Sequence, residues 1–168
     1  IVCDDGADAY AATGLLVTKE SIATVEHSRF VNSRGAPTIT TSDSSELDIQ
    51  YSTISNNQVD EDGIYAGRCA GITVISGSSV TMSFVSLFSN TGVVSGALLV
   101  SGSGSTAHTF HSLLHSNRGT TSTLGSGAIA VTSNGSVSIT ETTIDNNMGT
   151  APTGAGAILG TDASIIVS

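Results

Sequence analysis

The sequence predicts an all-β fold, a right-handed parallel β-helix of about five to six coils with three short strands per coil. Two short motifs that recur along the 168 residues carry this prediction, together with the absence of any amphipathic helical pattern. Repeats of roughly 20–35 residues are typical of solenoids, in which each repeat stacks on the next. We expect residues 1–168 to form a single β-helix segment that belongs to a longer chain or assembly.

The first motif is a hydroxyl residue, any residue and a large apolar residue, followed by a polar stretch that contains asparagine. Its five copies are Ser28-Arg29-Phe30, Ser52-Thr53-Ile54, Ser86-Leu87-Phe88, Ser112-Leu113-Leu114 and Thr142-Thr143-Ile144. The asparagines that follow at one common distance are Asn57, Asn117 and Asn147, whereas Asn32 and Asn90 come one position earlier. This recurrence predicts that the same side chains meet in every coil.

The second motif, a glycine followed by small and apolar residues, precedes each copy of the first. It begins at Gly14, Gly35, Gly71, Gly96 and Gly127, and it begins once more at Gly156. The spacing from this glycine to the large apolar residue is nearly constant, whereas the spacing onward to the next glycine varies widely. Each coil therefore has a fixed part and one variable loop, as solenoids do when insertions collect at one corner.

The clearest copy assigns the strands of a coil. Residues 128–132 are predicted as a short strand, 133–136 as a turn rich in Ser, Asn and Gly, and 137–140 as an alternating second strand. Residues 143–144 form the third strand, after a bend at 141–142. Small residues at the start of the repeat are expected where the coil is narrow.

Stacking these coils at ~4.8 Å places like residues on like residues. One buried column would contain Phe30, Ile54, Phe88, Leu114 and Ile144, and another would contain Val25, Ile49, Met82 and Ile139. The asparagines would form a ladder of side-chain amides at a bend, with Asn117 on Asn147.

The third and fourth copies can be aligned in two registers that differ by one residue. The register decides whether Leu87 or Phe88 points inward, and whether Leu113 or Leu114 does. We favour Phe88 and Leu114 because the preceding hydroxyl then aligns in all five copies. Met82 and Asn90 fit better with Leu87.

Charge and hydropathy exclude several classes of function. The net charge is −9 and the five Lys and Arg residues are scattered, which argues against nucleic-acid binding. No apolar run approaches the roughly 18 residues of a membrane span. The chain begins with Ile1 and shows no signal peptide, so we expect an excised segment. The Ser- and Thr-rich, Lys-poor composition favours an extracellular or cell-surface location.

The sequence contains two cysteines and one glycosylation sequon, and it leaves open whether the cysteines are bridged and whether the sequon is glycosylated. Cys3 and Cys69 are too few for a disulfide framework, and the sequence allows either one bridge between them or two free thiols. Asn134 begins the sequence Asn134-Gly135-Ser136, a glycosylation acceptor if the chain passes through a secretory pathway.

No residues are assigned as catalytic, cofactor-binding or metal-binding. The acidic clusters Asp4-Asp5-Gly6-Ala7-Asp8 and Asp60-Glu61-Asp62 lack the spacing of a calcium loop, so we expect solvated charges. His108, His111 and His115 would face different sides of a strand rather than converge on zinc.

A catalytic acid pair is not expected either. Glu46 and Asp48 share a strand face, but Glu141 would lie about three coils away from them, and the other acids inside the repeats are scattered. These others are Glu20, Glu26, Asp43 and Asp145.

The motifs resemble those of the polymorphic outer-membrane protein family and of autotransporter-type β-helix surface proteins. Ser52-Thr53-Ile54-Ser55-Asn56-Asn57 and Gly127-Ala128-Ile129 carry this resemblance, although the family's double glycine is replaced by Ser126-Gly127 and similar pairs. The resemblance implies a structural or adhesive segment of a surface protein, rod or filament that is not an enzyme.

The alternative is a carbohydrate-binding or polysaccharide-cleaving β-helix. Exposed aromatic residues along one wall would favour that alternative, but Tyr10, Tyr51 and Tyr65 do not align in one column. Ser138, Thr140 and Thr142 are expected to be ordinary outward polar residues of a half-buried wall. The expected partners are neighbouring coils or chains that stack on the open ends, and surface glycans.

We expect the segment from Thr161 to Ser168 to end within a strand, without a capping element.

Overall fold

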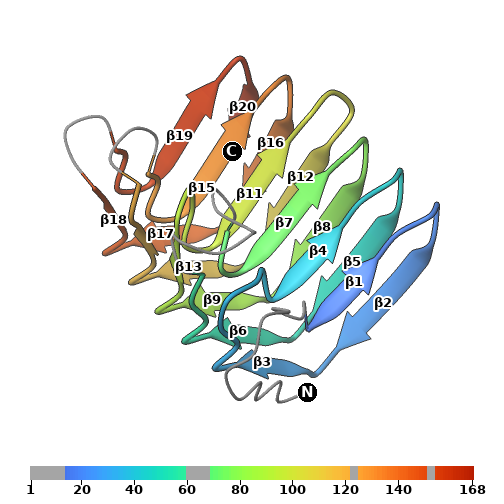
Figure 1. Cartoon of the computed structure of the whole chain (residues 1–168), viewed down its shortest axis with the longest axis horizontal. Coiled ribbons are helices and arrows are strands. Elements are labelled where there is room, and N and C mark those ends of the chain that lie inside the picture. The colour runs from blue at the N-terminus through green and yellow to red at the C-terminus, as the bar shows by residue number, and fades with distance from the viewer. Residues whose placement is uncertain (1–13, 60–68, 122–124, 151–153) are drawn as a thin grey trace.

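A computed structural model describes residues 14–59, 69–121, 125–150 and 154–168 as a stack of coils. Every element in these ranges is a β-strand, and all pairing between strands is parallel. The coils follow one another along the long axis, from β1 to β20 (Figure 1). The expected all-β parallel β-helix is confirmed, because each coil returns beside the previous one and successive coils pair strand on strand.

Three sheets form the walls of the helix. The first sheet contains β1 (Leu15–Val17), β4 (Ile39–Thr41), β7 (Ile72–Ile75), β11 (Leu98–Ser101), β15 (Ile129–Thr132) and β19 (Ile158–Thr161). The second contains β2 (Ile22–Glu26), β5 (Glu46–Gln50), β8 (Ser79–Ser83), β12 (Thr106–Phe110), β16 (Ser136–Thr140) and β20 (Ser164–Val167). The third contains β3 (Arg29–Val31), β6 (Thr53–Ser55), β9 (Ser86–Phe88), β13 (Leu113–His115) and β17 (Thr143–Asp145).

A fourth, narrow sheet was not predicted. It consists of β10 (Thr91–Gly92), β14 (Arg118–Gly119) and β18 (Met148–Gly149), and isolated parallel bridges continue its line through Gln58 to Arg34. Each strand has only two residues, too few to show an alternating pattern in the sequence. The coil therefore has three main walls and a short fourth one, instead of three alone.

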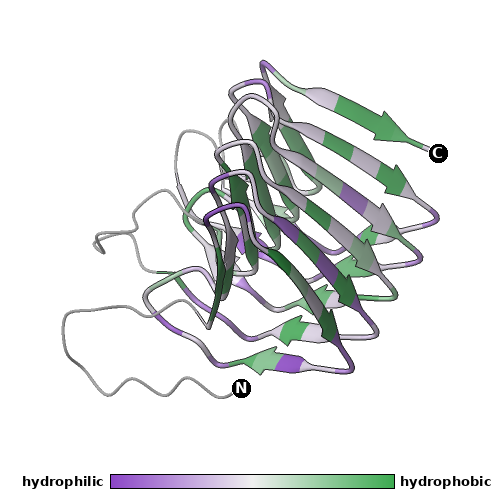
Figure 2. Cartoon of the chain, turned by 90° about the vertical axis from the view of Figure 1, so that its right-hand side faces the viewer, coloured by the Kyte–Doolittle hydropathy of each residue, from purple (hydrophilic) through white to green (hydrophobic). Residues whose placement is uncertain are grey.

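The core lies between the walls, where the inward side chains of each strand stack in columns. Apolar and polar residues alternate along the strands (Figure 2). The predicted second column is present, since Val25, Ile49, Met82 and Ile139 occupy equivalent positions. Thr109 takes the place between Met82 and Ile139, and its hydroxyl donates to Thr142 Oγ1 at 3.2 Å. A polar side chain is tolerated there because it has a partner.

The predicted column of the third sheet is correct except at its middle member. Phe30 pairs with Ile54, Ile54 with Leu87, Leu87 with Leu114, and Leu114 with Ile144. Leu87 is completely buried, whereas Phe88 lies on the outer face beside Ser55 and His115. The preference for Phe88 was therefore wrong, and the preference for Leu114 is confirmed.

The position of the hydroxyl residue explains why the third copy was aligned one residue out of register. Ser28, Ser52, Ser112 and Thr142 occupy one bend, where a hydroxyl accepts the backbone N–H of the preceding coil in three of the five coils. In the third coil this position is Val85, and Ser86 already belongs to β9. Thr142 therefore points into the bend and caps backbone groups, rather than outward as expected.

The predicted asparagine ladder is present at the bend after the third sheet, and Asn90 belongs to it. The Asn117 side-chain Nδ2 donates to Asn147 Oδ1 at 3.0 Å and to the carbonyl oxygen of Leu87 at 2.9 Å. Asn90 donates to Asn117 Oδ1 at 3.0 Å, and Asn57 donates to Asn90 Oδ1 at 2.9 Å. In the first coil, Ser33 N–H meets Asn57 Oδ1, so Asn32 lies outside the ladder.

Small residues at the start of each repeat are required by close backbone approach. A Cβ added at Gly96 would lie 2.6 Å from Arg118 N and 2.7 Å from the carbonyl oxygens of Asn90 and Gly127. All three contacts are to backbone, which cannot move aside without breaking the stack. The expected narrow part of the coil is therefore confirmed at Gly96.

Candidate functional site

A column of planar side chains runs along the corner between the second and third sheets. Its members are His27, Tyr51, Phe84 and His111, followed by Glu141 in the fifth coil. All five have φ between 45° and 56°, the left-handed region that bulky side chains rarely adopt. The corner is thus a one-residue bend that directs the same side chain outward in every coil.

The rings stack nearly parallel on one another. Centroid distances are 5.2 Å for His27–Tyr51, 5.1 Å for Tyr51–Phe84 and 5.0 Å for Phe84–His111, with interplanar angles of 9°, 6° and 15°. Tyr51 and Phe84 remain 53% and 49% exposed. Such pairs contribute ~0.5–1.5 kcal/mol each, about what a left-handed residue costs. The column therefore offsets the strain of its own bend.

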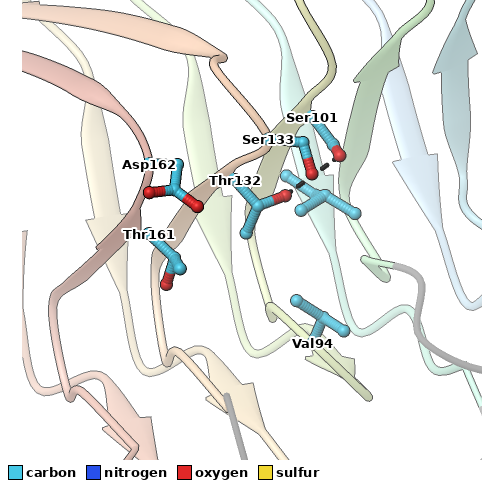
Figure 3. A pocket seen from close by; sticks show the side chains of 7 residues that line it. Val94, Ser101, Thr132, Ser133, Thr161 and Asp162 are labelled. Atoms are coloured by element: carbon cyan, nitrogen blue, oxygen red, sulfur yellow. Dashed lines mark hydrogen bonds between the residues drawn. The ribbon is translucent and has the colours of Figure 1, made fainter.

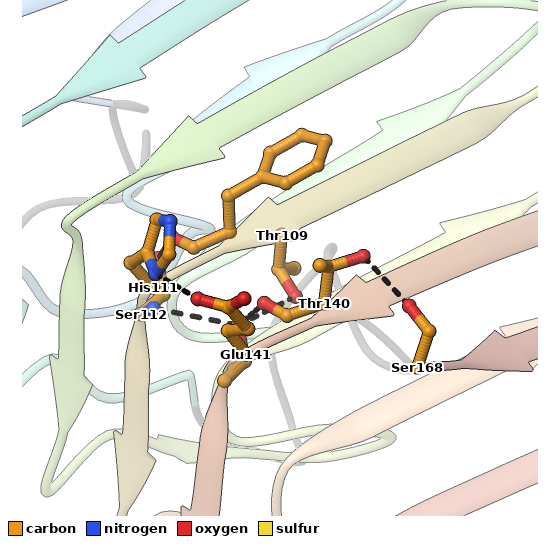
Figure 4. Close-up of polar contacts among 8 residues, drawn as sticks. Thr109, His111, Ser112, Thr140, Glu141 and Ser168 are labelled. Carbon is orange, nitrogen blue, oxygen red and sulfur yellow. Dashed lines mark hydrogen bonds and ion pairs between the residues drawn. The ribbon is translucent and has the colours of Figure 1, made fainter.

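The C-terminal end of this corner column is an imidazole–carboxylate pair. His111 Nδ1 lies 2.8 Å from Glu141 Oε2, and both side chains are about half exposed or more. Figure 4 shows this pair beside Ser112 and the Thr140–Ser168 contact. An exposed pair of this kind is worth at most about 1 kcal/mol.

A second ring pair lies on the outer face of the third sheet. Phe88 stacks on His115 with a centroid distance of 5.0 Å and an angle of 16°. Asp145 follows His115 in register, as Glu141 follows His111 at the corner. The third, fourth and fifth coils thus repeat the order aromatic, histidine, acid twice on neighbouring lines.

The three histidines named from the sequence do not converge. His108 lies on the outer face of the second sheet with its ring 6.4 Å from that of Phe110, His111 is at the corner, and His115 is on the third sheet. Among the described residues, no three His, Cys, Asp or Glu side chains are placed to hold one metal ion.

The acids of the repeats are also spread along the rod. Glu46 and Asp48 share the outer face of β5, as predicted, and Asp48 Oδ2 accepts from Gln50 Nε2 at 2.8 Å. Glu141 is three coils further on. The two acidic clusters near the start of the chain and at 60–62 lie outside the described residues.

The corner column has a signal in the sequence, but an alignment of the tyrosines alone does not reveal it. Its members immediately precede the hydroxyl residue in four coils, at His27, Tyr51, His111 and Glu141. In the third coil the one-residue slip moves the position to Phe84, ahead of Val85. Tyr51 therefore has planar neighbours, but they are Phe and His rather than Tyr.

A groove opens on the outer face of the first sheet. It has a volume of about 340 Å³ and lies across β11, β15 and β19, with Val94 and Leu99 on one side. The polar side chains around it are Ser101, Thr132, Ser133, Thr161 and Asp162. Thr132 Oγ1 donates to Ser101 Oγ at 2.9 Å (Figure 3).

Cys69 is a free, fully buried thiol at the start of the third coil. Burial raises its pKa from 9.0 to about 12, against the lowering effect of hydrogen bonds from the backbone of Gly71 and Ile72 and from Ser95. The bridge to Cys3, one of the two open alternatives, is not formed by Cys69, and Cys3 itself lies outside the described residues. Asn134 is exposed in the turn before β16, as an acceptor for glycosylation must be.

Comparisons with protein-family models, with curated proteins and with solved structures gave no match to this chain. Within the described ranges, the chain contains no helix of the length and hydropathy that crossing a bilayer requires.

Proposed function

We propose that this chain is a structural or adhesive segment of an extracellular surface protein, in which the stacked coils act as a rod or filament shaft. The observation that carries this proposal is the unbroken register of the ladders. Backbone pairing, core columns, the asparagine ladder and the corner column all run through successive coils without a break. A shaft needs this repetition, whereas it requires no reactive group.

The corner column supports a structural role more than a binding one. Sugars pack against the faces of aromatic rings, yet in this column the faces of Tyr51 and Phe84 are covered by the neighbouring rings. These two rings therefore expose their edges to solvent, and not their faces. The resemblance of the repeats to surface β-helix proteins also favours a structural role, and this support is an analogy of fold.

We further propose that the shaft is extended by pairing at its strand edges. Among the described residues, β20 pairs with β16 alone, and its Ile166 and Val167 are 58% and 67% exposed. An apolar strand with one unpaired edge is a template for another strand. The proposed partner is a further coil of the same kind, from the same protein or from a second molecule.

Sedimentation velocity and electron microscopy of the chain test this edge pairing. We expect concentration-dependent, end-to-end assembly that Val167→Lys abolishes, because an inward-pointing charge on an edge strand prevents pairing. Ser138→Lys is the matched control, since it adds the same charge to the outer face of β16, a strand paired on both sides. A monomer at all concentrations, or assembly unaffected by Val167→Lys, would contradict the proposal.

Carbohydrate binding is the second candidate, and the groove on the first sheet favours it. Hydroxyl and carboxylate groups border this groove beside aliphatic side chains, which is a common composition of small-ligand sites. We propose no polysaccharide cleavage, because Glu46 and Asp48 lie on another sheet and Glu141 is three coils from them.

A further inference from the structure

The groove on the first sheet is bordered by a row of hydroxyl groups in register. Ser101, Thr132 and Thr161 are paired positions on β11, β15 and β19, so their side chains leave the same face of the sheet at intervals of ~4.8 Å. Val94 and Leu99 provide an aliphatic wall next to this row. A ligand with several hydroxyl groups on a compact carbon frame matches both surfaces.

The polar groups of the groove retain hydrogen-bonding capacity. The side chains of Ser133, Thr161 and Asp162 form no hydrogen bond with any described residue, and Ser101 uses its oxygen only to accept from Thr132. The Asp162 backbone is held in place, because its carbonyl oxygen accepts the Asn134 N–H at 2.6 Å. A positioned carboxylate can accept from two neighbouring hydroxyl groups at once.

The charge of the groove selects the class of ligand. Among the described residues that line it, Asp162 is the one ionisable residue, and none is a Lys or Arg. An anionic ligand such as a uronate or a phosphate would be repelled, in a chain that already has a net charge of −9. One carboxylate is also too few for a calcium ion, which takes six to eight oxygen ligands.

We propose that this groove is a binding site for a neutral sugar unit, with Asp162 accepting from a pair of adjacent ring hydroxyls. The row of Ser101, Thr132 and Thr161 contacts the remaining hydroxyls, and Val94 and Leu99 pack against the C–H face of the ring. The volume of about 340 Å³ falls within the usual range for small-ligand sites. This inference rests on the second candidate function and is independent of the shaft.

The test uses methyl pyranosides of glucose, mannose, galactose and N-acetylglucosamine, with methyl glucuronide as the anionic counterpart of the glucoside. Amide NMR titration of the whole chain measures affinity and location together. We expect saturable, millimolar binding of at least one neutral glycoside with shifts at Thr132 and Ser133. The glucuronide should bind about tenfold more weakly than the glucoside.

Two isosteric variants and one control locate the site. Asp162→Asn should weaken binding of the neutral glycoside about tenfold and remove the discrimination against the glucuronide, and Thr132→Val should weaken it severalfold. Asp145→Asn removes a carboxylate from β17, on the third sheet, and should change nothing. No saturable binding, or equal binding by wild type, Asp162→Asn and Thr132→Val, would overturn the inference.

The experiments distinguish a failure of the proposed sugar site from a failure of the proposed shaft. All three substitutions are at partly or fully exposed side chains, so circular dichroism and sedimentation of the variants should match wild type. Loss of binding with unchanged assembly concerns the groove alone, and loss of assembly with unchanged binding concerns the shaft alone.

Discussion

Whether a single residue of this β-helix is buried or exposed depends on which face of a wall it occupies. Leu87 and Phe88 are neighbours of similar hydropathy, yet Leu87 is buried in a column and Phe88 stacks on His115 outside. The neighbours in the coils above and below make the choice, because Ile54 and Leu114 form a slot that only an inward residue can fill.

Truncation of these two residues should have different costs. Leu87→Ala should lower the free energy of unfolding by about 3 kcal/mol, since it removes a fully buried side chain and leaves a cavity. Phe88→Ala should cost less, about 1–2 kcal/mol, since it removes a partly buried ring on the outer face and its stacking contact with His115 but leaves no enclosed cavity. Urea unfolding followed by circular dichroism measures both, and a larger loss for Phe88→Ala would restore the alternative register.

The thiol of Cys69 should be inert in the folded chain. Its pKa of about 12 keeps it protonated at neutral pH, and its burial excludes reagents. Iodoacetamide labelling at pH 8, read by peptide mass spectrometry, should modify Cys69 only after unfolding. Rapid labelling of the native chain would show that the start of the third coil opens.

The same shift has a consequence for stability. Between pH 9 and 12 the unfolded thiol ionises while the folded thiol keeps its proton, so the unfolded state binds fewer protons. The free energy of unfolding therefore does not depend on this thiol's ionisation below pH 9, and it falls as the pH rises from 9 toward 12.

At the scale of elements, the bends hold the walls in place. Each of the three main corners contains residues with positive φ and a ladder of side chains that accept backbone N–H groups of the preceding coil. The strands have only two to five residues each, too short to be stable alone. Side-chain ladders at the bends therefore add the regular contacts that short strands lack.

The asparagine ladder gives the sharpest test of this role. Asn117→Asp keeps the shape of the side chain but removes two donors and places a carboxylate in a buried bend. The Leu87 carbonyl oxygen then loses the donor Nδ2, and Asn147 Oδ1 keeps the Asn117 backbone N–H but faces a carboxylate in place of the amide. We expect a loss of at least about 2 kcal/mol in thermal or urea unfolding.

Asn56→Asp is the matched control for this ladder variant. It makes the same chemical change at an exposed residue of the same line of bends, which already has φ of 57° and requires a residue tolerant of that conformation. Its cost should be within about 0.5 kcal/mol of zero. Equal losses for the two variants would mean that the ladder has no special role.

At the scale of the whole molecule, the chain is a one-dimensional stack. Each coil contacts the coils directly before and after it, and the register continues from β1 to β19 along one wall. Stability in such a stack is nearly a sum of coil and interface terms, so coils with two neighbours are held more firmly than a coil with one.

Hydrogen exchange should reveal this gradient. Amides of β7, β11 and β15 should exchange most slowly, and those of β1, β2, β19 and β20 should exchange fastest, because each of these four strands has one paired side among the described residues. The measurement requires a concentration at which sedimentation shows monomer, since end-to-end pairing would protect β20. Uniform protection along the chain would contradict a stack of weakly coupled coils.

The sequence alone determined the architecture. Recurrence of the two motifs predicted a β-helix, four of the five members of the third-sheet column and the asparagine ladder from Asn57 to Asn147. Periodic patterns of this kind are local, so each copy can be aligned with the others without any knowledge of contacts. The strands of 128–132, 137–140 and 143–144 were correct within one residue at each end.

Only the tertiary structure decided the register of the third coil, the corner column and the groove. A one-residue slip in a motif is invisible when a hydroxyl residue, here Ser86, follows directly after the bend residue, here Val85, because the choice of register depends on packing against Ile54 and Leu114. The corner column required knowing that a left-handed bend aims its residue outward in every coil. The groove required the placement of Val94 beside Ser101, Thr132 and Thr161, which lie on different coils and meet only when the coils are stacked.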